Sequence, residues 1–249
     1  MPAENAVRLN KFLAQNGLCS RRGADELIRQ GAVTVNGQKA EAGTKVDPAR
    51  DQVAVHGKPV APAASAAGLT LALHKPVQVV TTARDPQGRP TVLELLPPEI
   101  RKLRPNPVGR LDFLSEGLLL LTTDGELCNR LTHPRHHVPK TYRVRLRGRV
   151  SDEALRSMRS GMTLVEGDVL APVPTRVLSE AFGETLLEMI LVQGVNRQIR
   201  RMCRDLNLTV LQLTRTAQGP VLLGDLKPGA WRELTPRELR DLRKAAGLS

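Results

Sequence analysis

The sequence has very few aromatic residues. One tryptophan, one tyrosine and three phenylalanines make up 2% of its 249 residues. Modules that bind single-stranded nucleic acid by stacking bases usually expose several aromatic rings. That mode of binding is therefore disfavoured, and recognition of a nucleic acid would depend on groove shape, phosphates and arginines.

Cysteine is also scarce. The three cysteines are Cys19, Cys128 and Cys203. They are odd in number, lie far apart and form no Cys-x-x-Cys pair, so we expect buried free thiols and neither a disulfide framework nor a cysteine zinc site. His133, His136 and His137 follow Cys128, but this spacing fits no usual structural zinc site. We predict no metal, and no Gly-x-x-x-x-Gly-Lys-Ser loop indicates ATP.

Long apolar runs are missing. The apolar stretch at 117–121 is far shorter than the roughly 18–20 residues of a membrane span. The start of the chain, MPAENAVRLNK, lacks the apolar centre of a signal peptide. We therefore expect a cytoplasmic protein with no membrane partner.

Acidic residues are outnumbered by basic ones. The chain has 37 Lys and Arg against 25 Asp and Glu, which gives a net charge of +12. Such an excess favours a polyanionic partner, and nucleic acid is the leading candidate. Charge alone leaves open a DNA-binding regulator, although helix-turn-helix recognition would need a partner dimer or a base-reading helix.

Two short helices are predicted near the N-terminus. Leu9, Phe12 and Leu13 have helical spacing and precede Gly17, a suitable helix stop. Ser20 can cap a second helix that ends near Gly31. Its first turn holds two arginines, which the helix dipole disfavours unless an external anion is present. The alternatives are solvated surface arginines or phosphate contacts.

A hairpin follows, because Asn36 and Gly37 lie between alternating residues. The segments RLNKFLA, CSRRGADELIRQGAVTVNG and DQVAVHGKPV together resemble an S4 RNA-binding domain. The resemblance implies RNA contacts from the first-turn basic residues and the adjacent loop. These are Lys11, Ser20, Arg21 and Arg22. We expect this small S4 (αL-type) domain over 1–60, a linker over 61–68 from the sequence APAASAAG, and a larger domain over 69–249.

The larger domain is predicted to be α+β. Short apolar strands alternate with brief helices, without the regular period of a doubly wound fold. Strands are expected at 69–75, 117–123, 141–149, 174–179, 185–193, 209–215 and 221–223. Helices are expected at 125–132, 152–160, 197–206 and 236–245, the last opened by a capping box from Thr235 to Glu238.

The densest motif is PVGRLDFLSEG, a loop that leads into the apolar strand GLLLLTT. Asp112 in this loop can be a turn residue, a partner of Arg110, or a reactive carboxylate at the mouth of a rigid sheet. The run VGRLDFLSEGLLLLTTDGELCNRLTHPRHHVPKTYRV resembles the signature of the RsuA-type pseudouridine synthases. LALHKPVQVVTTARDPQGRPTVLELLP, GVNRQIRRMCRDL and LTRTAQGPVLLGDLKPGAWRELT extend the resemblance along the rest of the chain.

The resemblance implies a mixed, mainly antiparallel catalytic sheet with flanking helices and a cofactor-free isomerisation with Asp112 as the nucleophile. Tyr142 would pack against the target uracil, although alone it reads equally well as an inward strand residue. An arginine of the RQIRR segment would hold the carboxylate, with Arg200 the first choice and Arg197 the second. RNA contacts are expected from Arg110, Lys140, Arg197, Arg201 and Arg215. Two departures from the family pattern, at Gln78 and Leu114, affect only the substrate loops.

The reaction expected is the conversion of uridine to pseudouridine in ribosomal RNA, folded or partly assembled. The large-subunit RNA is favoured over the small-subunit RNA, and the protein is expected to be a monomer. The alternative is a non-catalytic RNA-binding factor for ribosome assembly.

Overall fold

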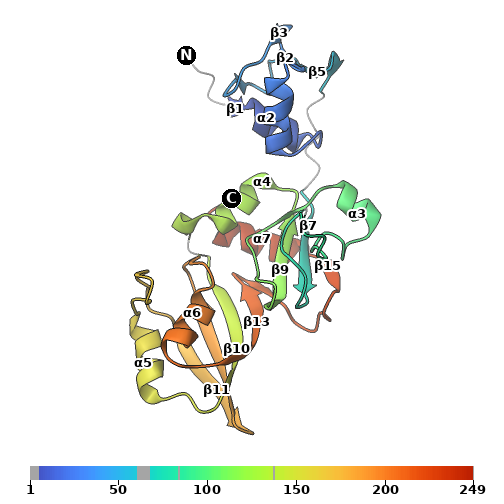
Figure 1. Ribbon diagram of the computed structural model, residues 1–249. Coiled ribbons are helices and arrows are strands. Elements are labelled where there is room, and N and C mark those ends of the chain that lie inside the picture. Colours follow the sequence, from blue (N-terminus) through green and yellow to red (C-terminus); the bar gives the residue numbers. More distant parts are fainter. Residues whose placement is uncertain (1–5, 61–67, 84, 137, 249) are drawn as a thin grey trace. The chain divides into compact units, whose positions relative to one another are not determined.

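The computed structural model describes residues 6–60, 68–83, 85–136 and 138–248, and the chain divides into two compact units, Met1–Gly68 and Leu69–Ser249 (Figure 1). Of the linker expected over 61–68, residues 61–67 lie outside this description. No described helix is both long and apolar enough to cross a membrane.

All three cysteines are free, but only Cys203 is buried and the other two are half-buried, which corrects the expectation of three buried thiols.

The N-terminal unit packs two helices against short strands. They are β1 (Val7–Arg8), α1 (Leu9–Gln15), α2 (Arg21–Arg29), β2 (Val33–Val35), β3 (Gln38–Lys39), β4 (Lys45–Val46), β5 (Val53–Val55) and β6 (Lys58–Pro59). The apolar face predicted for α1 is buried, and Gly17, with φ +74°, follows the end of this helix as predicted. The Ser20 hydroxyl accepts a hydrogen bond from the Gly23 amide at 3.1 Å, which confirms the predicted cap. Asn36 and Gly37 both have positive φ and join β2 to β3 as predicted.

The larger unit contains a nine-stranded sheet. Its main path is β11 (Thr175–Ala181), β12 (Glu184–Leu191), β10 (Lys140–Arg147), β13 (Val210–Gln218), β9 (Glu116–Thr122), β7 (Thr70–Lys75) and β15 (Trp231–Glu233). Outside this path, β14 (Val221–Leu222) pairs with β13 and β8 (Asn106–Pro107) pairs with β9. The strands of this sheet pair antiparallel except for β9 and β13, which run parallel. The prediction of a mixed, mainly antiparallel sheet is confirmed.

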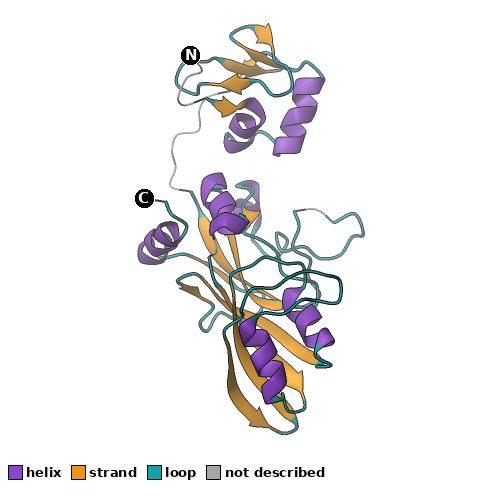
Figure 2. Ribbon diagram, turned by 90° about the vertical axis from the view of Figure 1, so that its left-hand side faces the viewer, coloured by secondary structure: helices purple, strands orange, loops and turns teal. Residues whose placement is uncertain are grey.

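Helices flank this sheet, as Figure 2 shows. They are α3 (Pro98–Lys102), α4 (Gly125–Thr132), α5 (Asp152–Ser160), α6 (Gln198–Asp205) and α7 (Pro236–Ala245), with a 3-10 turn at Pro134–His136. Four of these helices lie within one residue of their predicted bounds. The exception, α3, was not predicted, and neither were β8 and β15, because each is too short to show a hydrophobic period.

The leucine run of β9 is buried on both faces. Leu118 and Leu120 pack in one apolar cluster with residues of α4 and α7. Leu119 and Leu121 face the other side and pack with Val79, among others. A strand covered on both faces needs apolar residues at every position, which explains the continuous run in the sequence.

The start of β9 lies unusually close to β13. Gly117 has φ +107°, and a Cβ atom there would lie 2.3 Å from the carbonyl oxygen of Arg215. Only glycine can occupy this position, because any side chain would overlap the neighbouring backbone. The loop that carries Asp112 therefore ends at a fixed point of the sheet.

A buried lysine holds the same loop from the β7 side. Lys75 is fully buried, and its Nζ donates hydrogen bonds to the carbonyl oxygens of Ser115 at 2.7 Å and Pro76 at 2.8 Å. Burial lowers the pKa of Lys75 from 10.5 to about 8, although the charges of Asp112 and Glu116 oppose this shift. The loop thus depends on a desolvated ammonium group.

The substitution Gly117→Ala should destabilise the larger unit by about 2–5 kcal/mol, because it adds a backbone overlap to an unfavourable positive φ. Urea unfolding followed by Trp231 fluorescence measures the free energy of unfolding. Gly229→Ala is the matched control, since Gly229 has φ +82° and open space around its Cα. Equal losses in the two variants would contradict the close contact.

The free energy of unfolding should rise with pH between pH 8 and pH 10.5, because the unfolded chain then binds a proton at Lys75 that the folded chain has lost. Over this whole pH range the free energy of unfolding should increase by about 3 kcal/mol. The free energy of unfolding is measured across this pH range for the wild-type chain and for Lys75→Met. The difference between the two isolates the contribution of Lys75. The prediction fails if both chains show the same pH dependence.

Candidate active site

A cavity of about 290 Å³ lies where the loop before β9 meets β10, β13 and the start of α6. Seven residues that the sequence singled out line this cavity together. They are Arg110, Asp112, Lys140, Tyr142, Arg197, Arg200 and Arg215. Segments separated by as many as 100 residues thus converge on one site.

Asp112 lies in a tightly held turn between β8 and β9. The Ser115 amide donates to the Asp112 carbonyl oxygen at 3.1 Å. The Thr81 hydroxyl donates to the Leu111 carbonyl oxygen at 2.8 Å and accepts from the Leu111 amide at 3.2 Å. These bonds fix the backbone, while the Asp112 side chain remains about one-third exposed, at 32%. Asp112 is therefore a turn residue whose carboxylate is still accessible to a ligand.

The cation nearest the Asp112 carboxylate belongs to Arg197, which corrects the first choice of Arg200. Arg197 Nη1 lies 3.9 Å from Asp112 Oδ2. Arg197 adopts the left-handed conformation, with φ 50° and ψ 33°, immediately before α6. This strained backbone directs the chain into the helix beside the carboxylate, a geometry that helical spacing could not predict.

Arg200 holds the loop rather than the carboxylate. Its Nη2 donates to the Leu114 carbonyl oxygen at 2.7 Å and lies 3.4 Å from Ser115 Oγ. Burial and the nearby charge of Arg197 lower the pKa of Arg200, and the charge of Asp112 opposes this effect. The three groups therefore form one electrostatic cluster in which Arg197 pairs with the acid and Arg200 positions its loop.

Tyr142 forms one wall of the cavity from β10. It is half-buried and packs against two apolar clusters, one under α5 and α6 and one under the loop at 79–96. The pairing with β13 shifts register between Thr141 and Tyr142, so that Tyr142 faces Arg215. A bulge at this point reorients side chains beside the site, as bulges often do.

Two cations predicted to contact RNA are part of the cavity wall, one buried and one half-buried. Arg215 is 1% exposed, and its Nε donates to the Leu118 carbonyl oxygen at 2.6 Å. Lys140 donates to the Val138 carbonyl oxygen at 3.2 Å, and burial, with the charge of Arg215, lowers the pKa of Lys140. Because Arg215 is buried in the wall, only a group that enters the cavity can reach it, and its contact with RNA stays a prediction.

Two arginines of α6 that do not line the cavity pair with acidic side chains. Arg201 forms ion pairs with Glu166 and Asp168, and Arg204 pairs with Glu166 and Asp205. Asp205 is the last residue of α6, but Glu166 and Asp168 come from a segment distant in sequence, so the helix alone could not reveal them. The charge of Arg201 is therefore partly compensated by these acids, and its predicted contact with RNA stays a prediction.

The cavity is built to accept a polar ligand. Its lining includes one carboxylate, that of Asp112, and five cationic side chains. Gln198 Oε1, Arg200 Nε and Arg215 Nη2 are buried without a hydrogen-bond partner among the described residues. An unpartnered buried polar atom costs about 1–3 kcal/mol, so atoms of this kind in one cavity indicate groups that a ligand satisfies.

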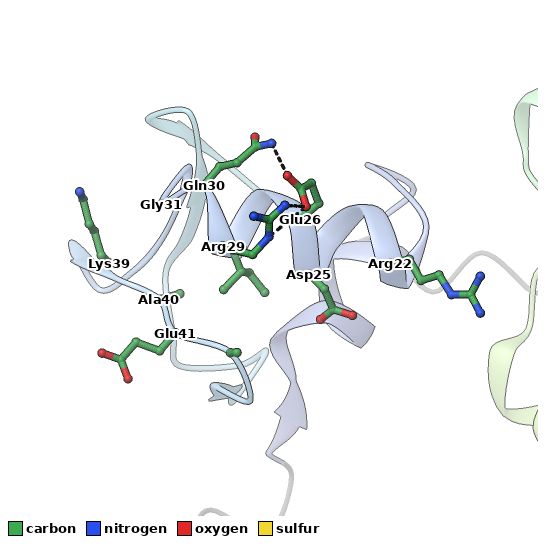
Figure 3. A pocket seen from close by; sticks show the side chains of 11 residues that line it. Arg22, Asp25, Glu26, Arg29, Gln30, Gly31, Lys39, Ala40 and Glu41 are labelled. Carbon is green, nitrogen blue, oxygen red and sulfur yellow. Dashed lines mark hydrogen bonds and ion pairs between the residues drawn. The ribbon is translucent and has the colours of Figure 1, made fainter.

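The four residues predicted to bind RNA in the N-terminal unit lie near the start of α1 or α2. Arg21 and Arg22 are exposed, and neither forms an ion pair with a described residue. Figure 3 shows Arg29 and Gln30 turned onto Glu26, whereas Arg22 extends away from this cluster. Ser20 caps α2 and Lys11 is half-buried. Their contacts with RNA stay a prediction.

Sequence reasoning missed three residues that shape the site. Lys75 supports the loop from below, Thr81 clamps its backbone, and Gln198 lines the cavity. A lysine inside the apolar strand LALHK was the one available signal, because such a residue needs internal partners. In the described part of the chain, no group of three or more His, Cys, Asp or Glu could hold a metal ion.

Comparison with known proteins agrees with this geometry. The model of the RNA pseudouridylate synthase family matches residues 70–205, and the model of the S4 domain matches residues 7–53. An uncharacterized RNA pseudouridine synthase of Aquifex aeolicus is 43% identical over 97% of this chain and 96% of its own length. The dual-specificity RNA pseudouridine synthase RluF of Escherichia coli O6:H1 is 37% identical over 98% of this chain and 81% of its own.

A solved structure shares the architecture as well. The crystal structure of a pseudouridylate synthase superposes with a TM-score of 0.69 at 29% identity, covering 95% of this chain and 99% of that one. The resemblance inferred from the motifs is thereby confirmed. The chain belongs to the RNA pseudouridine synthase family, in its RsuA-type branch with an N-terminal S4 domain.

Proposed function

We propose that this protein converts a uridine of ribosomal RNA to pseudouridine, with Asp112 as the reactive carboxylate. One observation carries the proposal: Asp112 is the single carboxylate lining a cavity with a tyrosine wall and five cationic side chains. The family membership supplies the reaction class. The choice of ribosomal RNA, and of the large subunit over the small, rests on the resemblance to RsuA-type enzymes.

The reaction breaks the bond between ribose C1′ and N1 of uracil, rotates the base and joins C1′ to C5. C5 then loses its proton and N1 gains one, so that the product is an isomer of the substrate. The Asp112 carboxylate either attacks C1′ or removes a proton from C2′. Both routes need an accessible carboxylate held in place, and the turn at 112–115 with Arg197 at 3.9 Å provides one. The reaction is an isomerisation, so we propose that it needs no cofactor.

The other cavity residues would hold the base and its phosphates. The Tyr142 ring can pack against the uracil face, and Gln198 Oε1 and Arg215 Nη2 offer an acceptor and a donor to its polar edge. Extracting a base from its stack costs a few kcal/mol, which contacts between Arg110 and the flanking phosphates would offset.

The two units of the chain have different proposed roles. We propose that residues 1–60 dock on folded RNA through Lys11, Ser20, Arg21 and Arg22, that 61–68 link the units, and that 69–249 perform the chemistry. RNA binding is supported by the S4 match over residues 7–53. We further propose a cytoplasmic monomer.

Asp112→Asn should reduce pseudouridine formation at least about a thousandfold, because an amide can neither attack C1′ nor accept the C2′ proton. Pseudouridine mapping of ribosomal RNA transcripts, treated without added metal or nucleotide, measures this loss. RNA binding by Asp112→Asn should stay within about twofold of the wild type. Binding without modification by the wild-type protein would favour the assembly-factor alternative.

Arg197→Gln should lower kcat/KM by about 10- to 100-fold, because the carboxylate loses the cation that orients it. Single-turnover kinetics on the mapped RNA gives the value. Arg204→Gln is the matched control, since Arg204 pairs with Glu166 and Asp205 outside the cavity. Indistinguishable kinetics for the two variants would remove Arg197 from the site.

A further inference from the structure

A second cavity of about 290 Å³ adjoins the one that holds Asp112. Residues 110–112 line both cavities, so this short stretch of loop forms the partition between them. The far side of the second cavity is formed by residues at 80–82 and 85–89, and Thr81 is bonded to Leu111 of the partition. One wall of the second cavity is thus part of the catalytic loop, and the opposite wall is hydrogen-bonded to that loop.

An aromatic ring lies at this second cavity. Phe113 directly follows Asp112, and its side chain is 37% exposed. The chain has only two other phenylalanines: Phe12 is buried in the N-terminal unit, and Phe182 lies fully exposed in the turn between β11 and β12. An exposed ring beside a cavity is a surface on which a nucleobase can stack.

A fixed cation accompanies the ring. The Arg89 guanidinium carbon lies 5.9 Å from the centre of the Phe113 ring. Asp85 holds this guanidinium with two hydrogen bonds, at 3.0 Å from Nε and 2.8 Å from Nη2, and accepts a third from the Arg89 amide at 2.9 Å. The Asp85 side chain is only 5% exposed. Arg89 is therefore held in place at the edge of the cavity by Asp85, although its side chain is 43% exposed.

The rim adds a second positive charge. Arg110 is exposed, lines both cavities and forms no ion pair with any residue in the described ranges. A phosphate that joins two nucleotides, one in each cavity, would pass over the partition beside this guanidinium. Arginine suits such a position because its fork binds phosphate oxygens in pairs.

We propose that the second cavity is a subsite for the nucleotide next to the target uridine, whose base stacks on Phe113 beside Arg89. The proposal rests on the proposed function, since the neighbouring cavity must take the uridine. Asp112 and Phe113 are consecutive, with Cα atoms about 3.8 Å apart. Because residues 110–112 line both cavities, adjacent nucleotides of one strand can occupy the two cavities. The ring replaces the stacking that the neighbour loses when the uridine leaves the helix.

Phe113→Ala should lower kcat/KM on the mapped RNA by about 5- to 150-fold, the range expected when a base loses its aromatic platform. Phe113→Tyr keeps the ring and should retain activity within about twofold. Phe182→Ala is the matched control, because it removes an exposed phenylalanine far along the chain from the site. Equal activity of Phe113→Ala and Phe182→Ala would overturn the subsite.

RNA substrates with an abasic nucleotide on either side of the uridine identify the neighbour concerned. At the position that binds Phe113, the abasic substitution should slow the wild type as much as Phe113→Ala does, and the two changes together should cause no further loss. If the loss of rate from Phe113→Ala multiplies with the loss from the abasic substitution at both positions, Phe113 stabilises the fold or the catalytic loop instead of a base.

A readout that does not need catalysis separates the two proposals. In the full chain, Phe113→Trp should show fluorescence quenched by at least about half on saturation with ribosomal RNA transcripts, after subtraction of the wild-type signal from Trp231. Phe182→Trp should show no quenching. If the wild type makes no pseudouridine but quenching occurs, the proposed function fails and base stacking at Phe113 stands. Saturated RNA binding without quenching overturns the subsite in either case.

Discussion

The contact between Gly117 and the backbone of Arg215 fixes the active-site loop to the sheet. A Cβ atom at Gly117 would lie 2.3 Å from the Arg215 carbonyl oxygen, so β9 and β13 approach here as only glycine allows. This is also where the parallel pair of β9 and β13 joins the two halves of an otherwise antiparallel sheet. Asp112 precedes this junction by five residues, and its position follows from it.

Buried positive charge gives the site its chemical character. Lys75 and Arg215 are almost fully buried, and both donate to carbonyl oxygens around the catalytic loop. Burying charged groups is costly unless hydrogen bonds and opposite charges compensate. Here the Asp112 and Glu116 carboxylates lie close enough to oppose the lowering of the Lys75 pKa. Arg215 and the four other cationic side chains that line the cavity leave it receptive to a polyanionic ligand.

The sequence predicted four of the five helices of the larger unit, most strands of its sheet and seven of the residues that line the cavity. The run GLLLLTT predicted a strand, the capping box at Thr235 and Glu238 is present, and α4, α5 and α7 have their expected bounds. These features depend on local patterns, which a single sequence carries. The resemblance to the family motifs assigned residues from separate segments to one site, which hydrophobic periodicity could not do.

Two features of α6 could not be predicted from its sequence pattern. Arg197 and not Arg200 faces Asp112 because of a left-handed backbone residue before α6. The charge of Arg201 is partly compensated by Glu166 and Asp168, which lie more than thirty residues earlier. Helical spacing places these arginines around the α6 axis but says nothing about what packs against each side.

A crystal structure of the Asp112→Asn protein bound to its RNA would test the central claim most directly, because the substituted enzyme should hold an unreacted substrate. The account predicts one uridine turned out of its stack into the cavity, with its C1′ facing the amide at position 112 and its base against Tyr142. RNA bound through the S4 domain with no nucleotide in this cavity would contradict the account.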